Sequence, residues 1–528
     1  MDAFFDKLAH QLSSNGAITG DQLKLVVSIL SSYFFAYAYR YLPANGSTSR
    51  VASIRHMYSI SIALYTTLIF LKLYTGFLHI SLTSLITFLL IKHNHTSIAP
   101  WINFAVVMVS MSLCHLDRQR KGNSGDTTLD YSGMMMIATI KLTMFGFNVQ
   151  DGRVSMQQGG KKKDLPLTSY NQQMKITKFP TLLEFSGWMF FFGGFLVGPA
   201  CEYMDYLRFT SQQHLQRKQG GIPSSAKPTV MILVKSALSI GILLSCSAKY
   251  NVPLMLKPEW QAGSFAKKLL FIQVTAFVAR CKYYTVWLLS EGACVLCGFG
   301  FTGYDERTGE PRWDRVTNIN VVHCELPQSL KEMSDNWNMG ANRWLKHYVY
   351  LRVTPPDKKA GAASTLMTYG VSALWHGFYP GYYIMFLSLG LFQTIGRMAR
   401  KTIRPFMLST TGQPLPIQKT IYDFLGIIAT MFIINTMSMS FVGLYLDPVF
   451  QIWRQIYFVQ FFLGAAAWAG LKLVKKPLMR AQKQRGGPPM RQAVEPKAAE
   501  MDVTDLGGIE PPLPESTSNK AGLVDEKR

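Results

Sequence analysis

The chain has 528 residues, of which 48% are hydrophobic and 16% charged, with a formal net charge of +23 at pH 7. Soluble domains average about 25% charged residues, so this composition argues against a string of soluble domains and indicates an integral membrane protein. Lys and Arg lie mostly in short segments between apolar blocks, where membrane proteins place them beside lipid head groups. The basic–aromatic modules typical of nucleic-acid binding are absent from the sequence.

The apolar residues come in blocks close to the length of about 20 residues that a membrane-spanning helix requires. An N-terminal segment, 1–22, precedes them; it lacks a basic n-region and is not a cleavable signal peptide. We therefore predict an all-α polytopic membrane protein with about 10 or 11 transmembrane helices in one domain, 23–474. The predicted spans are 23–42, 58–74, 77–91, 101–116, 131–148, 182–200, 229–247, 268–290, 364–393, 421–443 and 449–471.

The hydrophilic segments between and after these blocks suggest an orientation. The longest insertion is 300–360, and the tail 475–528 is too rich in Pro, Gly and charge to bury a core, so we expect it to be disordered. Basic residues beside the last span favour a cytosolic tail. Asn45 and Asn94 begin N-x-[ST] sequons, which are weak indicators of topology by themselves.

The segment 335–353 is predicted to be one amphipathic helix. Trp337 and Trp344 are seven residues apart and would share a face. Arg343 and Lys346 would form a basic edge, and Asn338 follows the first Trp. Taken alone, the pattern also fits an interfacial helix anchored by aromatic side chains.

The segment 372–386 places His376 inside an otherwise apolar run. An ionisable side chain at membrane depth is costly, so a functional role is the first hypothesis. Trp375 precedes it, and Gly and Pro residues after it would loosen the helix so that a ligand can approach. Hydroxyl groups follow at Tyr379 and Tyr383. The alternative is a core histidine that is bonded to a neighbouring helix.

The segment 279–293 carries Arg280, Tyr284, Trp287 and Glu291 on one helical face. Eleven residues rise about 16 Å along a helix, so Arg280 and Glu291 cannot pair directly. Each needs another partner or a wet cavity, and a structural ion pair is the competing interpretation.

A neutral imidazole and a carboxamide in an apolar environment suit acyl transfer from a thioester. Imidazole is mostly neutral at pH 7 and can take a proton from an attacking hydroxyl, while an Asn amide can stabilise the oxyanion. The sequence contains no G-x-S-x-G nucleophile elbow, no H-x4-D pair and no HExxH metal motif. No Ser or Cys lies as an evident nucleophile within the segments 337–345 and 375–383, so direct transfer without an acyl-enzyme intermediate is expected.

At these segments the sequence resembles the membrane-bound O-acyltransferase family, in its lysophospholipid acyltransferase branch and closest to the fungal members. The resemblance covers most of residues 20–470. The matching motifs are W-N-x5-W-L (Trp337, Asn338, Trp344, Leu345), W-H-G-x2-P-G-Y-Y (Trp375 to Tyr383), K-Y-Y-x2-W-x3-E-G (Lys282 to Gly292) and G-P-x3-Y-x-D-Y (Gly198, Pro199, Tyr203, Asp205, Tyr206).

The resemblance implies a helical fold around a reaction chamber in the endoplasmic reticulum membrane. Acyl-CoA would enter from the cytosol and a lysophospholipid from the bilayer, with no metal and no permanently bound cofactor. His376 would be the catalytic base, and Asn338 would orient it or polarise the thioester carbonyl. The supporting residues would be Trp337, Trp344, Trp375, Arg280, Tyr284, Glu291, Arg343, Lys346, Tyr379 and Tyr383.

Basic side chains near the motifs are candidates to bind the phosphates of CoA, among them Arg343, Lys346 and Arg352. Other interpretations stay open at this point. The acceptor could be a sterol, a diacylglycerol or a protein, or the chain could be a transporter or a membrane scaffold. A transporter often shows two matching halves, and no such internal symmetry is visible here.

Overall fold

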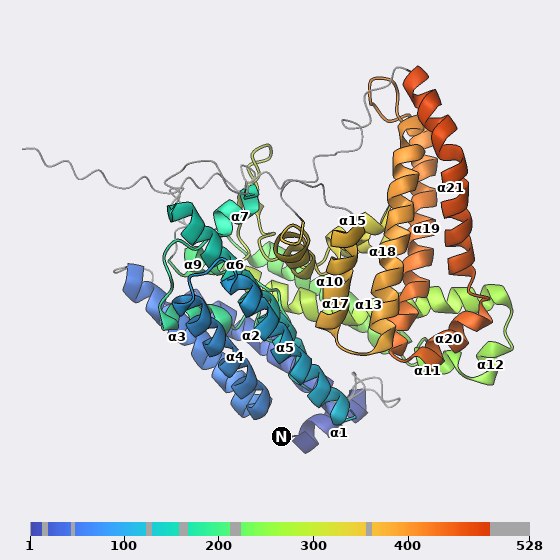
Figure 1. Cartoon of the computed structure of the whole chain (residues 1–528). Helices are drawn as coiled ribbons and strands as arrows, with labels where there is room; N and C mark the ends of the chain where they lie inside the picture. The colour runs from blue at the N-terminus through green and yellow to red at the C-terminus, as the bar shows by residue number, and fades with distance from the viewer. Residues whose placement is uncertain are drawn as a thin grey trace, which may run out of the picture.

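The computed structural model describes residues 2–12, 19–43, 48–122, 129–157, 167–211, 223–354 and 362–485. Within these ranges the chain is almost entirely helical, and its one sheet is a short hairpin. Helices α4 and α5 lie at one side, helices α18, α19 and α21 form a bundle at the other, and α10 and α13 run between them (Figure 1). The predicted all-α polytopic fold is confirmed.

The N-terminal half of the described chain is helical apart from its connecting segments. They are α1 (Asp2–Leu12), α2 (Gly20–Tyr39), α3 (Thr48–Leu64), the π-helical turn η1 (Tyr65–Phe70), α4 (Tyr74–His93), α5 (Ala99–Arg120), α6 (Ser132–Gln157), α7 (Ser169–Met174), α8 (Leu182–Met189), α9 (Tyr203–Thr210), α10 (Ala226–Cys246), α11 (Val252–Met255) and α12 (Pro258–Gln261).

The C-terminal half holds three of the four motif-bearing segments. Its elements are α13 (Phe265–Leu296), β1 (Gly303–Tyr304), β2 (Pro311–Arg312), α14 (Val321–Glu325), α15 (Leu330–Asn336), α16 (Met339–Trp344), the π-helical turn η2 (Leu345–Tyr350), α17 (Ala362–His376), α18 (Pro380–Thr402), the 3-10 turn η3 (Arg404–Met407), α19 (Pro416–Gly443), α20 (Leu446–Gln455) and α21 (Val459–Gln484). Strands β1 and β2 pair antiparallel.

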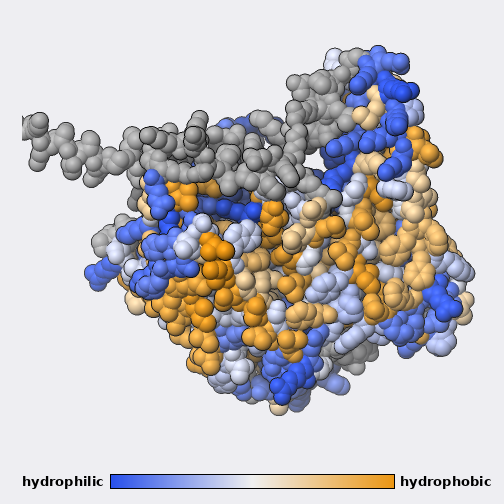
Figure 2. All heavy atoms as spheres, viewed as in Figure 1, coloured by the Kyte–Doolittle hydropathy of each residue, from blue (hydrophilic) through white to orange (hydrophobic). Residues whose placement is uncertain are grey.

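Several helices have the length and apolar character of membrane spans. Among the described residues, α4, α5, α6, α10 and α19 each qualify alone, and α20 with α21 would make a sixth span bent by 72°. Large apolar side chains are exposed on these helices, for example Leu78 on α4 and Leu238 on α10. Figure 2 shows a broad hydrophobic surface between hydrophilic ends, as a bilayer requires of a spanning protein.

The predicted span 182–200 is not one helix. Only α8 is helical, and the chain then turns through residues 190–202 inside the protein. A Cβ atom on Gly194 would lie 2.5 Å from the carbonyl oxygen of Pro199, and Gly198 has a φ of +88°. Because glycine is needed where the backbone folds back this tightly, an apolar run that hydropathy treats as a span becomes a buried loop.

Two other predicted helices are also divided. The span 364–393 breaks at Gly377, whose φ is +122°, into α17 and α18. The amphipathic helix predicted over 335–353 breaks at Asn338, which has φ 44° and ψ 57°. As a result Trp337 and Trp344 belong to different hydrophobic clusters rather than to one helical face. One division directly follows His376 and the other lies at Asn338.

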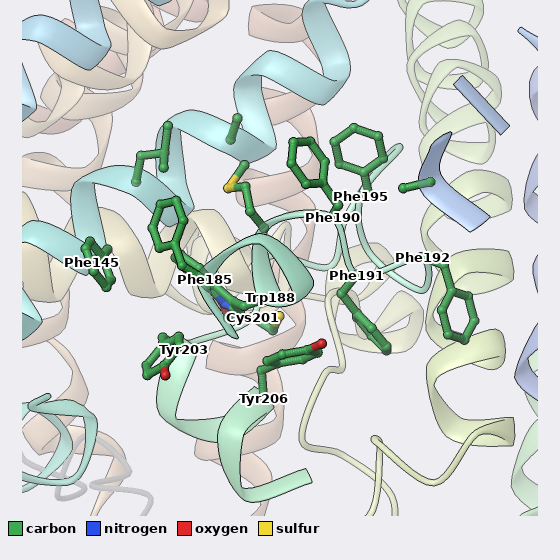
Figure 3. Close-up of a cluster of buried hydrophobic side chains, with 14 of the residues drawn as sticks. Phe145, Phe185, Trp188, Phe190, Phe191, Phe192, Phe195, Cys201, Tyr203 and Tyr206 are labelled. Atoms are coloured by element: carbon green, nitrogen blue, oxygen red, sulfur yellow. The ribbon is translucent and has the colours of Figure 1, made fainter. Parts of the chain in front are cut away.

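The largest hydrophobic core is aromatic and lies where α6, α8 and α9 meet (Figure 3). Trp188 is fully buried and its Nε1 donates to the carbonyl oxygen of Cys201 at 3.0 Å. Lys141 is buried beside it, and its ammonium group donates to the carbonyl oxygens of Trp188 and Met189 at the end of α8. A cation at a helix C-terminus satisfies carbonyls that lack intrahelical partners.

The described helix α21 continues to Gln484, past the expected boundary of the membrane domain at 474. Residues 486–528, which hold most of the predicted tail, lie outside the described residues, and so does the sequon residue Asn45. Asn94 ends α4, and its Oδ1 accepts a hydrogen bond from the backbone nitrogen of Thr96 at 3.0 Å.

Candidate active site

His376 is the last residue of α17 and sits in a box of aromatic rings. Its ring centroid lies 4.8 Å from that of Trp375, 5.5 Å from that of Tyr382, and 5.1 Å from those of Phe386 and Phe441. Phe386 stacks on it with an angle of 22° between the rings. Within the part of the chain that the structure describes, neither ring nitrogen of His376 has a hydrogen-bond partner, and the residue is half-buried rather than sealed in. The imidazole is thus oriented by contact and has both nitrogens free for a ligand.

The end of α17 is held by another helix. The Nε2 of the buried His115, on α5, bonds the carbonyl oxygen of Trp375 at 3.0 Å. The indole Nε1 of Trp375 donates to the carbonyl oxygen of Met136 on α6, also at 3.0 Å. Both contacts act on the residue directly before His376. The sequence offered no signal for His115, because 260 residues separate it from Trp375.

Asn338 begins α16 in the left-handed conformation, which Asn tolerates better than most residues. Its turn is bonded to the segment before α14. The backbone nitrogen of Met339 donates to the carbonyl oxygen of Asn318 at 2.8 Å, and that of Gly340 donates to the Asn318 Oδ1 at 3.0 Å. Such unfavourable backbone angles persist where the surroundings over-determine them and cluster at functional sites.

Glu291 stabilises the Asn338 turn indirectly, through the segment that contains Thr317 and Asn318. Its carboxylate is 4% exposed and accepts from the hydroxyl of Thr317 at 2.7 Å and from the backbone nitrogen of Asn318 at 3.3 Å. A chain of contacts therefore runs from Glu291 on α13 through Asn318 to the residues that follow Asn338. The structure connects this motif residue with the Asn338 turn and not with Arg280.

Arg280 and Tyr284 share a different partner, Glu325 on α14. The guanidinium of Arg280 grips the carboxylate with two bonds, Nε at 2.8 Å and Nη2 at 2.7 Å. Tyr284 donates its hydroxyl to the same carboxylate, and Arg280 also donates to Asn435 on α19. The expectation that Arg280 and Glu291 do not pair is confirmed, and the network joins α13, α14 and α19.

The tryptophans of the two motifs bring their segments together. Trp344 and Trp375 pack with ring centroids 5.7 Å apart, and the Nε1 of Trp344 donates to the Thr143 hydroxyl at 2.9 Å. Helix α17 packs against η2, which continues α16. Trp337 instead packs on Trp287 of α13 at 5.1 Å. The two motifs therefore meet through Trp344. Trp337 instead packs on α13, at the start of the Asn338 turn.

The basic edge predicted for Arg343 and Lys346 is divided between the interior and the surface. Arg343 is half-buried near the Tyr170 hydroxyl and the Glu202 carboxylate, whereas Lys346 is exposed. Arg352 is engaged by Asp151, with its Nη1 at 2.8 Å from Oδ1. Arg343 and Lys346 therefore keep more capacity for an anionic ligand than Arg352 does.

A buried carboxylate that sequence reasoning missed lies behind Arg343. Glu202 accepts hydrogen bonds from Asn148 at 2.8 Å, from Tyr170 at 2.7 Å and from Tyr348 at 2.8 Å. The Tyr170–Glu202 pair gives the nearby Arg343 guanidinium a polar, negatively charged environment. Glu202 is the third variable position within the G-P-x3-Y-x-D-Y motif, which was the one available signal.

The remaining predicted site residues are two tyrosines that follow His376. Tyr379 is buried and its ring packs edge-on against Tyr445, 5.4 Å away. Tyr383 is half-buried on α18. The described residues contain no group of three or more His, Cys, Asp or Glu side chains arranged to hold a metal ion.

An all-helical, multi-span protein with a histidine in an aromatic box and a constrained asparagine on a neighbouring segment has the features of a membrane-embedded acyltransferase. The family model described as "MBOAT, membrane-bound O-acyltransferase family" matches residues 23–440. The chain belongs to this family and is an O-acyltransferase.

Three relatives illustrate the similarity. A "Lysophospholipid acyltransferase" of Schizosaccharomyces pombe is 34% identical over 83% of this chain and 84% of its own length. A protein with the same name from Saccharomyces cerevisiae is 32% identical over 86% of this chain and 74% of its own length. The human "Membrane-bound glycerophospholipid O-acyltransferase 2" is 28% identical over 90% of this chain and 89% of its own length.

Proposed function

We propose that this enzyme transfers a fatty acyl group from acyl-CoA to the free hydroxyl of a lysophospholipid, with His376 as the general base. The observation that carries the proposal is the His376 ring, held by four aromatic side chains with both nitrogens free of hydrogen bonds to the described residues. The names of the two fungal relatives support the choice of acceptor.

The reaction needs one proton to move twice. His376 takes the hydroxyl proton of the lysophospholipid while the oxygen attacks the thioester carbon of acyl-CoA. A tetrahedral intermediate forms with its negative charge on the former carbonyl oxygen. As it collapses, the carbon–sulfur bond breaks and the departing thiolate takes the proton back from His376. The products are a diacyl phospholipid and CoA, and no group on the protein is consumed.

Asn338 has a separate role in this proposal. Its carboxamide would either orient His376 or donate to the developing oxyanion, as side-chain amides do in other acyl transfers. A preorganised donor is effective because it costs no reorganisation during the reaction. The bonds from the Met339 and Gly340 nitrogens to Asn318 support such preorganisation. Helix α16, which Asn338 begins, leads through Trp344 to the Trp375 next to His376.

The donor would approach from the side of Arg343 and Lys346. Guanidinium and ammonium groups suit the phosphates of CoA, and Arg343 lies near the hydrogen-bonded pair of Tyr170 and Glu202. We further propose that the protein resides in the endoplasmic reticulum membrane with its C-terminus in the cytosol. Protease protection of a C-terminal tag in sealed microsomes tests that orientation.

The central test uses purified full-length protein, a panel of labelled lysophospholipids and oleoyl-CoA, with the products separated by chromatography. Wild-type protein should form diacyl phospholipid only when both substrates are present. His376→Ala and Asn338→Ala should each lose about 100-fold or more in turnover, the usual contribution of a general base or an oxyanion donor. His323→Ala is the matched control, because His323 is an exposed histidine paired with Glu332.

Wild-type turnover in a folded His376→Ala protein would overturn the assignment of the base. Activity only with a sterol, a diacylglycerol or a protein acceptor would overturn the choice of substrate while leaving the O-acyltransferase chemistry intact. Lipid flux across vesicles that does not require acyl-CoA would indicate a transporter instead.

A further inference from the structure

We propose that the C-terminal ends of α18 and α21 form one binding surface for anionic phospholipid head groups. This basic surface consists of Arg397, Arg400, Lys401 and Arg404 from the first segment and Lys472, Lys475, Lys476, Arg480, Lys483 and Arg485 from the second. Neither 391–415 nor 459–485 contains an Asp or a Glu. A dense charge of one sign in two segments that carry no acidic residue attracts anionic ligands.

The two segments converge in space although they are far apart in sequence. Helix α18 packs along α21, and a Cβ atom on Gly464 would lie 2.5 Å from the ring of Phe392. Beyond the helices, the Arg485 guanidinium lies 5.7 Å from the Phe406 ring centroid, and its Nη2 donates to the Leu408 carbonyl oxygen at 3.4 Å. In Figure 1 both helix ends and the loop joining α18 to α19 lie together at one tip of the bundle.

The charges are available at this tip. Lys472, Lys475, Lys476, Arg480 and Lys483 are exposed, and in the described part of the chain none of them forms an ion pair. Asp423 on α19, an acidic group near Arg404, is hydrogen-bonded by Lys419 at 2.6 Å. The α21 part of the basic surface therefore faces outward, and these five side chains are available to an anionic ligand.

The surface continues directly from a lipid-facing one, which favours a lipid over a soluble partner. Trp468 is 48% exposed on α21, and the Lys472 ammonium lies 4.8 Å from its ring centroid. Leu473, at 79% exposed, is set among the lysines. Tryptophan and lysine at such a boundary mark the membrane–water interface, and Figure 2 shows hydrophilic residues capping this end above the hydrophobic surface. Clusters of Lys and Arg directly beyond a span attract anionic lipids.

Native mass spectrometry of the full-length protein, titrated in non-ionic detergent with phosphatidylserine or phosphatidylcholine, tests the proposal. We expect wild-type protein to bind phosphatidylserine more tightly and to lose that preference at high salt. A triple variant, Lys475→Glu with Lys476→Glu and Arg480→Glu, should bind phosphatidylserine at least about tenfold more weakly. A matched variant that changes the exposed Lys249, Lys257 and Lys267 to Glu should bind it like wild type.

Equal binding of the two lipids by wild-type protein would overturn the proposal. So would an equal loss in both triple variants, which would reflect net charge and not this surface. Retained acyltransferase activity and an unchanged unfolding temperature serve as folding controls, since the basic surface lies outside the proposed active site. A chain ending at Arg485 should bind phosphatidylserine as the full chain does. If phosphatidylserine bound only to the shortened chain, acidic residues of the tail would occupy the basic surface in the full-length protein. The assignment of this surface to lipid would then fail.

Discussion

The Nε2 of His115 on α5 lies 3.0 Å from the carbonyl oxygen of Trp375, the residue that precedes His376 on α17. Carbonyls in the last turn of a helix have no intrahelical donor, and here the donor comes from a helix distant in sequence. The bond orients the peptide group that links Trp375 to His376. Our proposed mechanism thus makes His115 a positioning residue for the base.

Replacing His115 should lower turnover more than substrate binding. His115→Phe removes the donor, and a small misplacement of a reacting group can cost about 10- to 100-fold, so kcat should fall while KM for acyl-CoA changes little. His115→Gln can donate an N–H from nearly the same place and should retain most activity. Steady-state kinetics on purified variants makes the comparison. Equal loss in both variants, or a fall in unfolding temperature alone, would show that the role is only structural.

Gly377→Ala should destabilise the turn after His376. A side chain at a φ of +122° is strained, and the new Cβ would lie 3.1 Å from the Nδ1 of His115. Strained backbone of this kind costs about 1–3 kcal/mol, so the unfolding temperature in detergent should fall. Gly370→Ala, in the middle of α17 with nothing within 4 Å of its Cβ, is the control and should stabilise slightly, because Ala favours helix. A lower unfolding temperature for Gly370→Ala than for Gly377→Ala would contradict the geometry described for α17.

Asn318→Ala should impair catalysis through the Asn338 turn. The variant removes the acceptor of the Gly340 nitrogen but not the backbone acceptor of Met339. We expect activity to fall by about tenfold or more, as positioning losses typically do. Asn318→Asp keeps an acceptor oxygen and should recover part of the loss. Rates are measured with saturating lysophospholipid and acyl-CoA. Asn318→Ala with wild-type rates would mean that the turn holds its shape without this bond.

Glu325 and Arg280 should show strong coupling in stability. Glu325→Ala leaves the guanidinium of the nearly buried Arg280 without its bidentate partner, and an unsatisfied buried polar group costs about 1–3 kcal/mol. The double variant with Arg280→Ala should be less destabilised than the sum of the single changes, because the two act as one unit. Thermal unfolding of the four proteins measures the coupling. Additive effects would indicate that the two side chains act independently.

Sequence reasoning was accurate where a local property decided the outcome. The helical polytopic fold follows from composition and block length, because each span satisfies its own backbone hydrogen bonds within the bilayer. The separation of Arg280 from Glu291 followed from helical rise alone. The prediction of a continuous helix at 335–353 was wrong, because the left-handed turn at Asn338 depends on bonds to Asn318, and these are tertiary contacts.

By itself, the sequence determined that this chain is a helical membrane protein with its His376 and Asn338 motifs on separate segments, because hydropathy and helical period are carried by neighbouring residues. Only the tertiary structure decided which helices are continuous, that Glu325 pairs with Arg280, and that His115 reaches the end of α17. The physical reason is that such contacts join residues tens to hundreds of positions apart. Their geometry exists only after the helices have packed.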